Sequence, residues 1–451
     1  MTLVDWINSV TDFGEWAAGR KPVAKKADAL RFGILGAAKI APSALVIPAR
    51  SHADVLVVAV AARDKKKAEA YAKRWDIPIV HDSYEDYAHC QSKVKVSSYH
   101  TPSHSPTSLI ALIADPSIDC IYNPLPNGLH YGPTLAALKA GKHVLLEKPS
   151  VSNAQEARSL FYHPILQGPS APVLLEASHY RFHPAWHLFL SQFDKQLVEY
   201  AEARAAIPSG LFSGSDIRFD YTIAGGCAMD LGHYSLSALR TVFGAEPVEV
   251  VSATPRLIPP PYDQRCDQAM GATYSFPNGG TGRVYSDLGA KGGYPFAWLT
   301  SNWPSFRDSV SSVRVRLRSQ ELGVDEESGL SKTQQKTIIM WNFMGPHAWH
   351  RIDVETVTLF KKRGSEEVVK QTKHVDKLKA YTWKQLNKKG EGEDWWPTYR
   401  YMLEEFVNRV KGREGSGAWV EGEESVKQMV ATDGTYEKAG LGIRPSRDGV
   451  E

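Results

Sequence analysis

The sequence predicts an α/β domain with a doubly wound parallel sheet, followed by an α+β domain with a large, open and mainly antiparallel sheet. A strand pattern at Arg31–Leu35 runs into a glycine turn and then a helix pattern. The continuous apolar run Asp54–Ala62 is typical of a parallel strand that is buried on both faces. The chain has 451 residues, of which 43% are hydrophobic, and is therefore long enough for two hydrophobic cores.

Strand and helix patterns alternate through the first domain, as a doubly wound sheet requires. We expect helices at about 39–50, 64–75 and 129–140, and strands at 31–35, 54–62, 77–81, 119–123 and 142–147. The alternation ends near Pro149, so the first domain is placed at residues 30–149. Residues 1–29 form an N-terminal arm and linker. Apolar residues at helical spacing within 3–16 favour packing on the protein's own body over docking on a partner.

The second domain, residues 150–451, contains strand patterns in runs. The expected strands are Val173–Glu176, Val248–Thr254, Ala272–Phe276 and Gly282–Tyr285, and two helix patterns follow at Trp396–Val410 and Glu421–Ala439. Gly440 directly follows the last pattern, where glycine commonly ends a helix. An open sheet leaves one broad face to be covered, so this domain is expected to form a homodimer.

Composition excludes several functional classes. The net charge is +3, with 53 Lys and Arg mixed among 50 Asp and Glu, so no broad field favours nucleic acid or an anionic membrane. The four cysteines are far apart and lack CxxC spacing, so neither a zinc site nor a disulfide framework is implied, and the reducing cytoplasm fits best. No signal-peptide or membrane-span pattern is present in the sequence. The expected partners are therefore a small-molecule substrate and a second copy of the chain.

Two stretches depart from the regular pattern. Residues 91–106 are rich in Ser, His and Pro and predict a surface loop, which is either a genuine insertion or translated intron from an incorrect gene model. Residues 361–389 are dense in lysine, which favours a solvated face or loop over contact with an anionic partner.

The first turn resembles a dinucleotide-binding fingerprint in which the middle glycine is replaced. Gly36, Ala38 and Ala41 stand at the three positions of a G-x-G-x-x-G/A pattern. The first position needs a tight turn, and the last needs a small residue where helix meets strand. Alanine at the middle position makes the pattern weak when it is taken alone.

Arg63 directly follows the second strand and bears on the choice of cofactor. An NAD enzyme places a carboxylate here on the ribose hydroxyls, whereas an arginine accommodates the 2′-phosphate of NADP. The pair Ala62-Arg63 therefore favours NADP over NAD. The alternative is a solvated surface arginine, with Asp64 beginning the next helix.

Further motifs lie at strand ends, where ligands bind in parallel sheets. The segments GAAKIA, NPLPNGLH, AGKHVLLEKPS, EASHYRFHP and GGCAMDLGHY together resemble the GFO/IDH/MocA oxidoreductases, over roughly residues 31–445. Within that family, the resemblance is to the branch of dimeric dihydrodiol dehydrogenases and fungal NADP-dependent D-xylose 1-dehydrogenases. It implies an NADP-binding Rossmann domain, and it implies the cofactor-binding residues Gly36, Ala38, Lys39, Ile40, Ala41, Arg63, Pro124, Asn127, His130, Glu147 and Lys148.

The resemblance also implies the catalytic residues. Lys148 of the EKP motif points at the nicotinamide, and Tyr234 is the acid/base that exchanges the hydroxyl proton. A close ammonium would lower the tyrosine pKa from its free value of about 10. Asp230, four residues before Tyr234, orients the substrate hydroxyl or the lysine, or simply begins the helix. Substrate-lining residues are expected in the YRFH segment: Tyr180, Arg181 and His183. No metal is expected, because the histidines lack partners at ligand spacing.

The predicted function is hydride transfer between NADP and a sugar or cyclic diol hydroxyl, with D-xylose to D-xylono-1,5-lactone as the best single substrate. Two alternatives remain: a non-catalytic NADP-binding regulator of the same fold, and a dehydrogenase or reductase of a biosynthetic pathway. Lys148 and Tyr234 argue against the regulator, because the EKP lysine is lost in such proteins.

Overall fold

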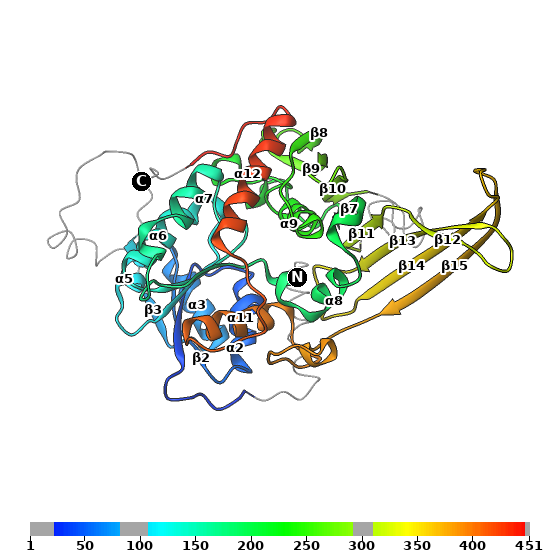
Figure 1. The fold of residues 1–451 in the computed structure, drawn as a ribbon. Helices are drawn as coiled ribbons and strands as arrows, with labels where there is room; N and C mark the ends of the chain where they lie inside the picture. The colour runs from blue at the N-terminus through cyan, green and yellow to red at the C-terminus, as the bar shows by residue number, and fades with distance from the viewer. Residues whose placement is uncertain (1–21, 82–106, 292–309, 447–451) are drawn as a thin grey trace. The chain divides into compact units, whose positions relative to one another are not determined.

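The computed structural model describes residues 22–81, 107–291 and 310–446 (Figure 1). The predictions for the N-terminal helix pattern at 3–16 and for the 91–106 loop lie outside these ranges. The chain forms two compact units. The first comprises the chain to His179, Tyr399–Val426 and the residues from Ser446, and the second comprises Tyr180–Thr398 and Lys427–Pro445.

The first unit is built on a six-stranded parallel sheet of order β3-β2-β1-β4-β5-β6. Its strands are β1 Leu30–Leu35, β2 Val55–Ala61, β3 Ile79–His81, β4 Cys120–Asn123, β5 His143–Leu146 and β6 Leu174–Glu176. The order reverses beside β1, as in a doubly wound sheet, and places the β1 and β4 turns at a topological switch point. The predicted fold class of this domain is confirmed.

Local sequence features explain where several of the connecting helices begin. They are a π-helical turn Pro42–Val46 leading into α2 Ile47–Arg50, then α3 Lys65–Trp75, α5 Thr107–Ala114, α6 Tyr131–Lys139 and α7 Ala154–Phe161. Asp64 caps α3 by accepting a hydrogen bond from the Lys67 amide at 3.1 Å, and Asn153 caps α7 through the Glu156 amide at 3.0 Å. The helix α11 Thr398–Val410 and the start of α12 Gly422–Lys438 also belong to this unit.

One sequence prediction about the sheets is wrong. The strand at Val173–Glu176 was assigned to the antiparallel sheet, whereas β6 pairs in parallel with β5 as the last strand of the first sheet. The first unit therefore continues to His179 and takes in α11, where the sequence led us to expect a boundary near Pro149. A three-residue strand carries too little pattern to declare its partner, which only long-range pairing decides.

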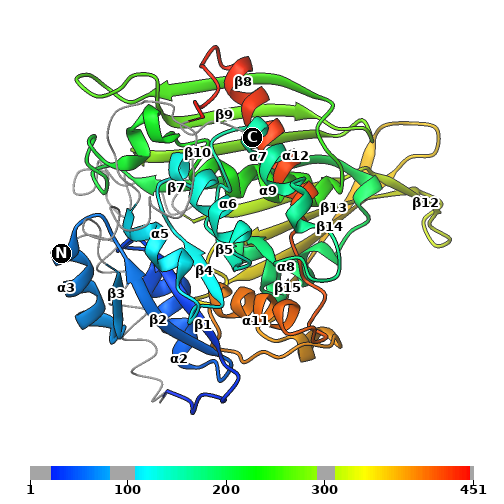
Figure 2. The same ribbon diagram turned by 90° about the vertical axis from the view of Figure 1, so that its left-hand side faces the viewer.

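The second unit contains a large sheet of order β15-β14-β13-β11-β7-β10-β9-β8, with β12 paired to β13 (Figure 2). The strands are β7 Val198–Pro208, β8 Glu249–Leu257, β9 Asp267–Ser275, β10 Thr281–Ala290, β11 Ser312–Leu317, β12 Gln320–Val324, β13 Ser331–Trp341, β14 Arg351–Lys361 and β15 Val368–Leu378. Every described pairing is antiparallel except that of β7 with β10. The prediction of a large, mainly antiparallel sheet is confirmed.

Helix α9, Leu231–Phe243, supplies much of the core of the second unit. Leu239 and Val242 are fully buried, and they pack with Val284 and Tyr274 from the sheet. The helix ends at Gly244, which adopts φ +62°. Almost every residue of α9 is buried, so side chains on it are held in fixed positions.

The lysine-rich stretch 361–389 forms the end of β14, the edge strand β15 and a short turn of helix at Trp383–Leu386. Most of β15 is exposed to solvent, so the stretch is a solvated face built on a strand. Figure 1 shows β13, β14 and β15 extending past α9 in the same unit. Within the described residues, no helix is long and apolar enough to span a membrane.

Candidate cofactor and substrate sites

The turn after β1 has the backbone geometry that the fingerprint requires. Gly36 adopts φ +90°, and its N–H donates to the Ala61 carbonyl oxygen at 2.6 Å. This φ favours glycine, and a Cβ here would also lie 3.1 Å from a Leu125 methyl carbon, closer than an ordinary contact. Ala38 is not among the residues with positive φ, and the methyl group at the middle position therefore causes no backbone strain. These residues fit a bound dinucleotide.

The next residues of the fingerprint divide between surface and core. Lys39 and Ile40 are exposed beside the turn, whereas Ala41 is fully buried where the first helix begins. Arg63 is exposed directly after β2. Because Leu35 pairs with Ala61, the Gly36 turn and Arg63 lie at the same edge of adjacent strands. Asp64 caps α3, as its helix-starting interpretation predicts.

The EKP motif is held by buried polar contacts. Glu147 is 5% exposed and accepts a hydrogen bond from the Tyr122 hydroxyl at 2.7 Å through Oε1. Its Oε2 accepts from the Lys148 amide at 3.2 Å, and its own amide donates to the Asn123 carbonyl oxygen at 3.0 Å. Burial and the neighbouring carboxylate raise the pKa of Tyr122 well above its usual value, so Tyr122 remains a hydrogen-bond donor. Glu147 thus positions the backbone that carries Lys148, which is half-buried.

His130 joins the two turns of this edge. Its ring is fully buried, with Nδ1 2.9 Å from the Pro149 carbonyl oxygen and Nε2 2.6 Å from the Leu125 carbonyl oxygen. Burial lowers its pKa to about 4, so the imidazole is neutral near pH 7 and donates one of these hydrogen bonds. Both ring nitrogens of His130 thus contact backbone carbonyl oxygens of the chain, and its role as a cofactor contact stays a prediction.

The remaining predicted members of the cofactor set lie on the same turn. Pro124 is buried directly after β4, and Asn127 begins a short helical turn at Asn127–Leu129. Asn123 holds this turn, because its amide donates to the His130 carbonyl oxygen at 3.2 Å and to the Thr134 hydroxyl at 2.9 Å. The structure therefore brings the predicted residues of β1, β2, β4 and β5 to one edge of the parallel sheet.

Sequence reasoning missed Glu176. This buried carboxylate at the end of β6 accepts from the Ser150 amide at 2.8 Å and from the Ser425 hydroxyl at 2.5 Å. It therefore fixes the residue after Pro149 to β6 and to helix α12. The strand-end position of the glutamate was a usable signal, but only if β6 had been assigned to the parallel sheet.

In the second unit, two glycines shape the loop before α9. A Cβ on Gly225 would lie 2.7 Å from the Arg218 carbonyl oxygen, and one on Gly226 would lie 2.3 Å from an Asp267 carboxylate oxygen. Asp267 is fully buried, accepts from the Ala228 amide at 2.7 Å and pairs with Arg444 at 2.9 Å. This ion pair fixes the loop on which α9 begins.

Asp230 lies at the N-terminus of α9, as its helix-starting interpretation predicts, and its orienting role stays a prediction. Its side chain makes no cap hydrogen bond; Oδ2 accepts from the Arg218 Nε at 2.8 Å. Arg218 also binds Asp216 at 3.0 Å and lies 4.3 Å above the Phe212 ring. The carboxylate of Asp230 is therefore charge-compensated, and Arg218 is a residue of this region that the sequence did not single out.

Tyr234 lies on the first turns of α9 and is 5% exposed. Its ring packs edge-on against Tyr180 with centroids 6.1 Å apart, and against His233 at 5.9 Å. His233 is buried, and its carbonyl oxygen accepts from the Gln428 side-chain amide at 3.3 Å. Tyr234 thus has a fixed position in an aromatic environment.

Most side chains of the YRFH segment are fully buried. Tyr180 is fully buried, donates to the Ser237 hydroxyl at 2.9 Å and packs against Trp186 at 5.0 Å. His183 is also fully buried and caps α8 Pro184–Leu190 by accepting from the Ala185 amide at 3.2 Å. Both side chains thus make contacts within the second unit, and their predicted substrate-lining role stays a prediction. Arg181 is half-buried, and its predicted role stays a prediction.

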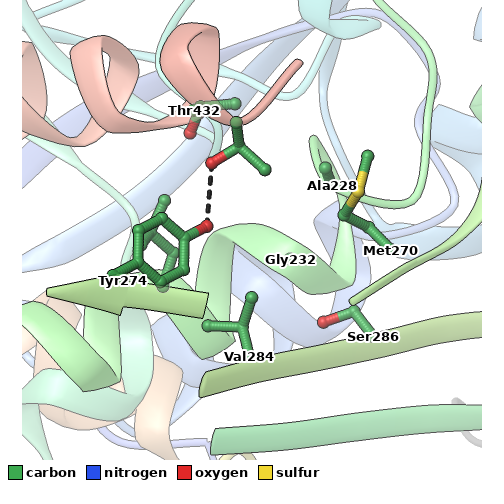
Figure 3. Close-up of a pocket in the computed structure, with 9 residues that line it drawn as sticks. Ala228, Gly232, Met270, Tyr274, Val284, Ser286 and Thr432 are labelled. Carbon is green, nitrogen blue, oxygen red and sulfur yellow. Dashed lines mark hydrogen bonds between the residues drawn. The ribbon is translucent and has the colours of Figure 1, made fainter. Parts of the chain in front are cut away.

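A small cavity lies between α9, strands β9 and β10, and α12 (Figure 3). Gly232, Met270, Tyr274 and Ser286 are among its lining residues, and the Tyr274 hydroxyl is 2.8 Å from the Thr435 hydroxyl. The volume is about 10 Å³, which is room for about one water molecule. Tyr234 does not line this cavity, which is too small for a sugar or a diol. In the described residues, no group of three or more His, Cys, Asp or Glu could hold a metal.

Comparison with known proteins identifies the family. Residues 30–163 match the model of an oxidoreductase family with an NAD-binding Rossmann fold, and residues 198–307 match the GFO/IDH/MocA C-terminal domain. The chain is 34% identical over 263 residues to a D-xylose 1-dehydrogenase (NADP(+)) of Haloferax volcanii, covering 57% of this chain and 70% of that one. This chain belongs to the GFO/IDH/MocA oxidoreductase family. Enzymes of this family are NAD(P)-dependent oxidoreductases.

Other relatives of this oxidoreductase agree with the assignment. A trans-1,2-dihydrobenzene-1,2-diol dehydrogenase of Mus musculus is 30% identical over 254 residues, covering 56% of this chain and 66% of the mouse enzyme. A 3-ketoreductase from Actinomadura kijaniata, solved with NADP and TDP-benzene, has a TM-score of 0.59 at 19% identity, covering 91% and 98% of the two chains. An aldose-aldose oxidoreductase from Caulobacter crescentus gives 0.60 at 18% identity, with 91% and 98% covered. At these identities, the solved structures support the fold alone.

Proposed function

We propose that this oxidoreductase uses NADP to transfer hydride to or from a hydroxyl-bearing carbon of a sugar or cyclic diol. D-xylose, oxidised to D-xylono-1,5-lactone, is the best single candidate, supported by 34% identity to an NADP-dependent D-xylose 1-dehydrogenase. The observation that carries the proposal is the Lys148 turn, which buried contacts from Tyr122, His130 and Glu176 hold at the ligand-binding edge of the sheet.

The cofactor is assigned from the Gly36 turn and Arg63. The turn offers the close backbone approach that a pyrophosphate needs, and the exposed Arg63 guanidinium at the adjacent strand end is suited to a 2′-phosphate. Bound NADP supplies the carbon that accepts or donates hydride. Nearby exposed Lys39 adds positive charge for the same phosphate.

Proton transfer is assigned to Tyr234, with Lys148 as its partner. Alcohol oxidation needs a base for the hydroxyl proton, and the phenol oxygen of Tyr234 would take that proton. The Lys148 ammonium would favour the phenolate form and hold the substrate oxygen. Lys148 belongs to the first unit and Tyr234 to the second, so their pairing is a proposal about chemistry. Asp230, compensated by Arg218, would orient the substrate from the start of α9.

The test is a screen of the purified protein for NADPH formation or consumption with aldoses, trans-dihydrodiols and small ketones. Turnover of D-xylose above that of the other classes supports the leading proposal. Turnover of the small ketones in preference to the other classes would favour the alternative of a biosynthetic reductase. A regulatory protein would be favoured if NADP bound without turnover of any substrate class. In that case Lys148→Met should bind NADP with the same affinity as the wild type.

We propose that the chain acts as a cytoplasmic homodimer through the outer face of the antiparallel sheet. Polar and aromatic side chains cover this face: Arg204 lies 5.0 Å over the Tyr285 ring, and Arg316 lies 5.5 Å over Tyr200. Such amphipathic side chains are enriched at protein interfaces. Light scattering at micromolar concentration should give about twice the chain mass of 49.9 kDa, and a clean monomer mass would exclude this dimer.

A further inference from the structure

A second pocket lies within the first unit, between the end of α11 and the loop that leads to α12. Its volume is about 190 Å³, and its walls include Glu405, Asn408, Arg409, Arg413 and Trp419. This volume is far larger than the single-water cavity near α9 and is enough for one molecule of about pentose size. None of these residues belongs to the cofactor or catalytic set described above.

The pocket is remote from the cofactor edge of the sheet. Arg413 in its wall binds both carboxylate oxygens of Asp54, at 2.9 and 3.1 Å. Asp54 immediately precedes β2, whereas Arg63 follows that strand at its other end. Seven strand residues at about 3.3 Å each separate the two ends by about 20 Å.

The charged groups in the wall already have partners. Arg413 is paired with Asp54, and Arg409 stacks 4.3 Å over the Trp419 ring with Glu421 3.9 Å away. Glu405 accepts from the Ser416 amide at 2.9 Å. Positive and negative charge are therefore balanced, which favours a neutral polar ligand over an anion.

Asn408 is the group that points to a ligand. It is 7% exposed and lines the pocket, yet its side-chain amide makes no hydrogen bond with any part of the chain that the structure describes. The amide atoms are open to the pocket, where they offer two donors and an acceptor to a ligand. Arg409 and Asn408 are adjacent on α11, so their donors are presented together, and the half-buried Trp419 ring offers apolar surface.

We propose that this pocket binds a neutral polyhydroxylated molecule of monosaccharide size, at a site separate from the cofactor edge. Hydroxyl groups pair with the Asn408 amide and the Arg409 guanidinium, and the carbon-bound hydrogens of the ligand contact Trp419. The inference depends on the pocket alone and not on the proposed reaction. A sugar-oxidising enzyme with such a site would sense a polyol or sugar in addition to its substrate.

The test uses xylitol as the probe, since it lacks the hemiacetal carbon that the proposed reaction oxidises. Saturation-transfer NMR titrations of the full-length protein should show saturable binding in the millimolar range. Asn408→Leu and Arg409→Ala should each weaken binding at least tenfold. Lys148→Met should leave it unchanged. Arg74→Ala is the matched control, because Arg74 also stacks on a tryptophan, 5.1 Å over Trp75, outside the pocket.

Three outcomes would overturn the proposal: no saturable binding, binding that Lys148→Met abolishes and Asn408→Leu spares, or saturable binding of sodium phosphate at this pocket in place of xylitol. Circular dichroism and thermal melting of each variant exclude unfolding as the cause of lost binding. Because the readout requires no turnover, failure of the oxidoreductase assignment leaves this result interpretable, and the reverse also holds.

Discussion

The two halves of the predicted catalytic machinery are held by different physical means. The Lys148 turn is fixed by buried polar contacts, with the carboxylates of Glu147 and Glu176 each accepting two hydrogen bonds. Tyr234 is fixed by aromatic packing on a helix that is almost wholly buried. Hydrogen bonds fix a backbone turn in direction, whereas close packing fixes a side chain in position. The comparison predicts that polar substitutions will be costly at the first region and volume changes at the second.

The largest expected effect comes from removing the proposed proton carrier. Tyr234→Phe keeps the ring packing but deletes the hydroxyl, so kcat should fall by about 10² to 10⁴ while the NADP dissociation constant changes little. Lys148→Met should be at least as damaging. Steady-state kinetics across pH, with cofactor titrations alongside, measure both effects once a substrate is identified. Retention of more than about a tenth of wild-type kcat at every pH would assign the proton transfer to another group.

A second effect should appear in the pH dependence of stability. Burial lowers the pKa of His130 from 6.5 to about 4, so the unfolded state binds more protons between these values. The contribution of His130 is therefore complete above pH 6.5 and is lost as the pH falls toward 4, by about 3 kcal/mol at about 1.4 kcal/mol per pH unit.

Denaturant unfolding between pH 4 and 7 measures this loss, with His130→Gln as the comparison. Other histidines, such as His187 in the second unit, also have a pKa lowered to about 4, so only the difference between the two proteins reports His130. Parallel pH curves for wild type and His130→Gln would mean that the buried ring is not responsible.

Arg63→Ala sharpens the cofactor assignment. Loss of a charge-assisted contact worth about 1.5–3 kcal/mol should raise the NADP dissociation constant about ten- to a hundredfold, while NAD binding barely changes. Fluorescence titration with both cofactors measures the ratio. Equal weakening for NADP and NAD would assign Arg63 to something other than the 2′-phosphate.

The smallest expected effect is the difference in stability between two matched tyrosine-to-phenylalanine variants, one in each region. Tyr122 and Tyr180 are both fully buried, but Tyr122 donates to a carboxylate and Tyr180 to the Ser237 hydroxyl. Tyr122→Phe should therefore cost about 1.5–3 kcal/mol of unfolding free energy, and Tyr180→Phe about 1 kcal/mol. Chemical denaturation of both variants measures the difference. If Tyr180→Phe cost more unfolding free energy than Tyr122→Phe, the charge on Glu147 would not be what strengthens the Tyr122 hydrogen bond.

Local features of the sequence already determined much of this protein. The turn after β1 needs a positive φ at position 36, which glycine adopts without strain, so the cofactor turn could be predicted. The apolar run before Ala62 is typical of a strand buried on both faces, so the doubly wound sheet could be predicted as well. The same holds for the Asp64 cap of α3 and for Gly440, which adopts φ +70° after α12. Each depends on contacts within a few residues.

Only the tertiary structure decided which distant segments meet. Because β6 belongs to the parallel sheet, Glu176 lies at the Lys148 turn. Arg218 pairs with Asp230 and compensates the charge of its carboxylate. Tyr180 lies in the core of the second unit, where its hydroxyl donates to Ser237. No local pattern specifies such partners, because burial and hydrogen bonding are satisfied jointly by residues far apart in the chain. The sequence therefore determined which reactive residue types stand at the strand ends. The tertiary structure decided which contacts hold each of these side chains in place.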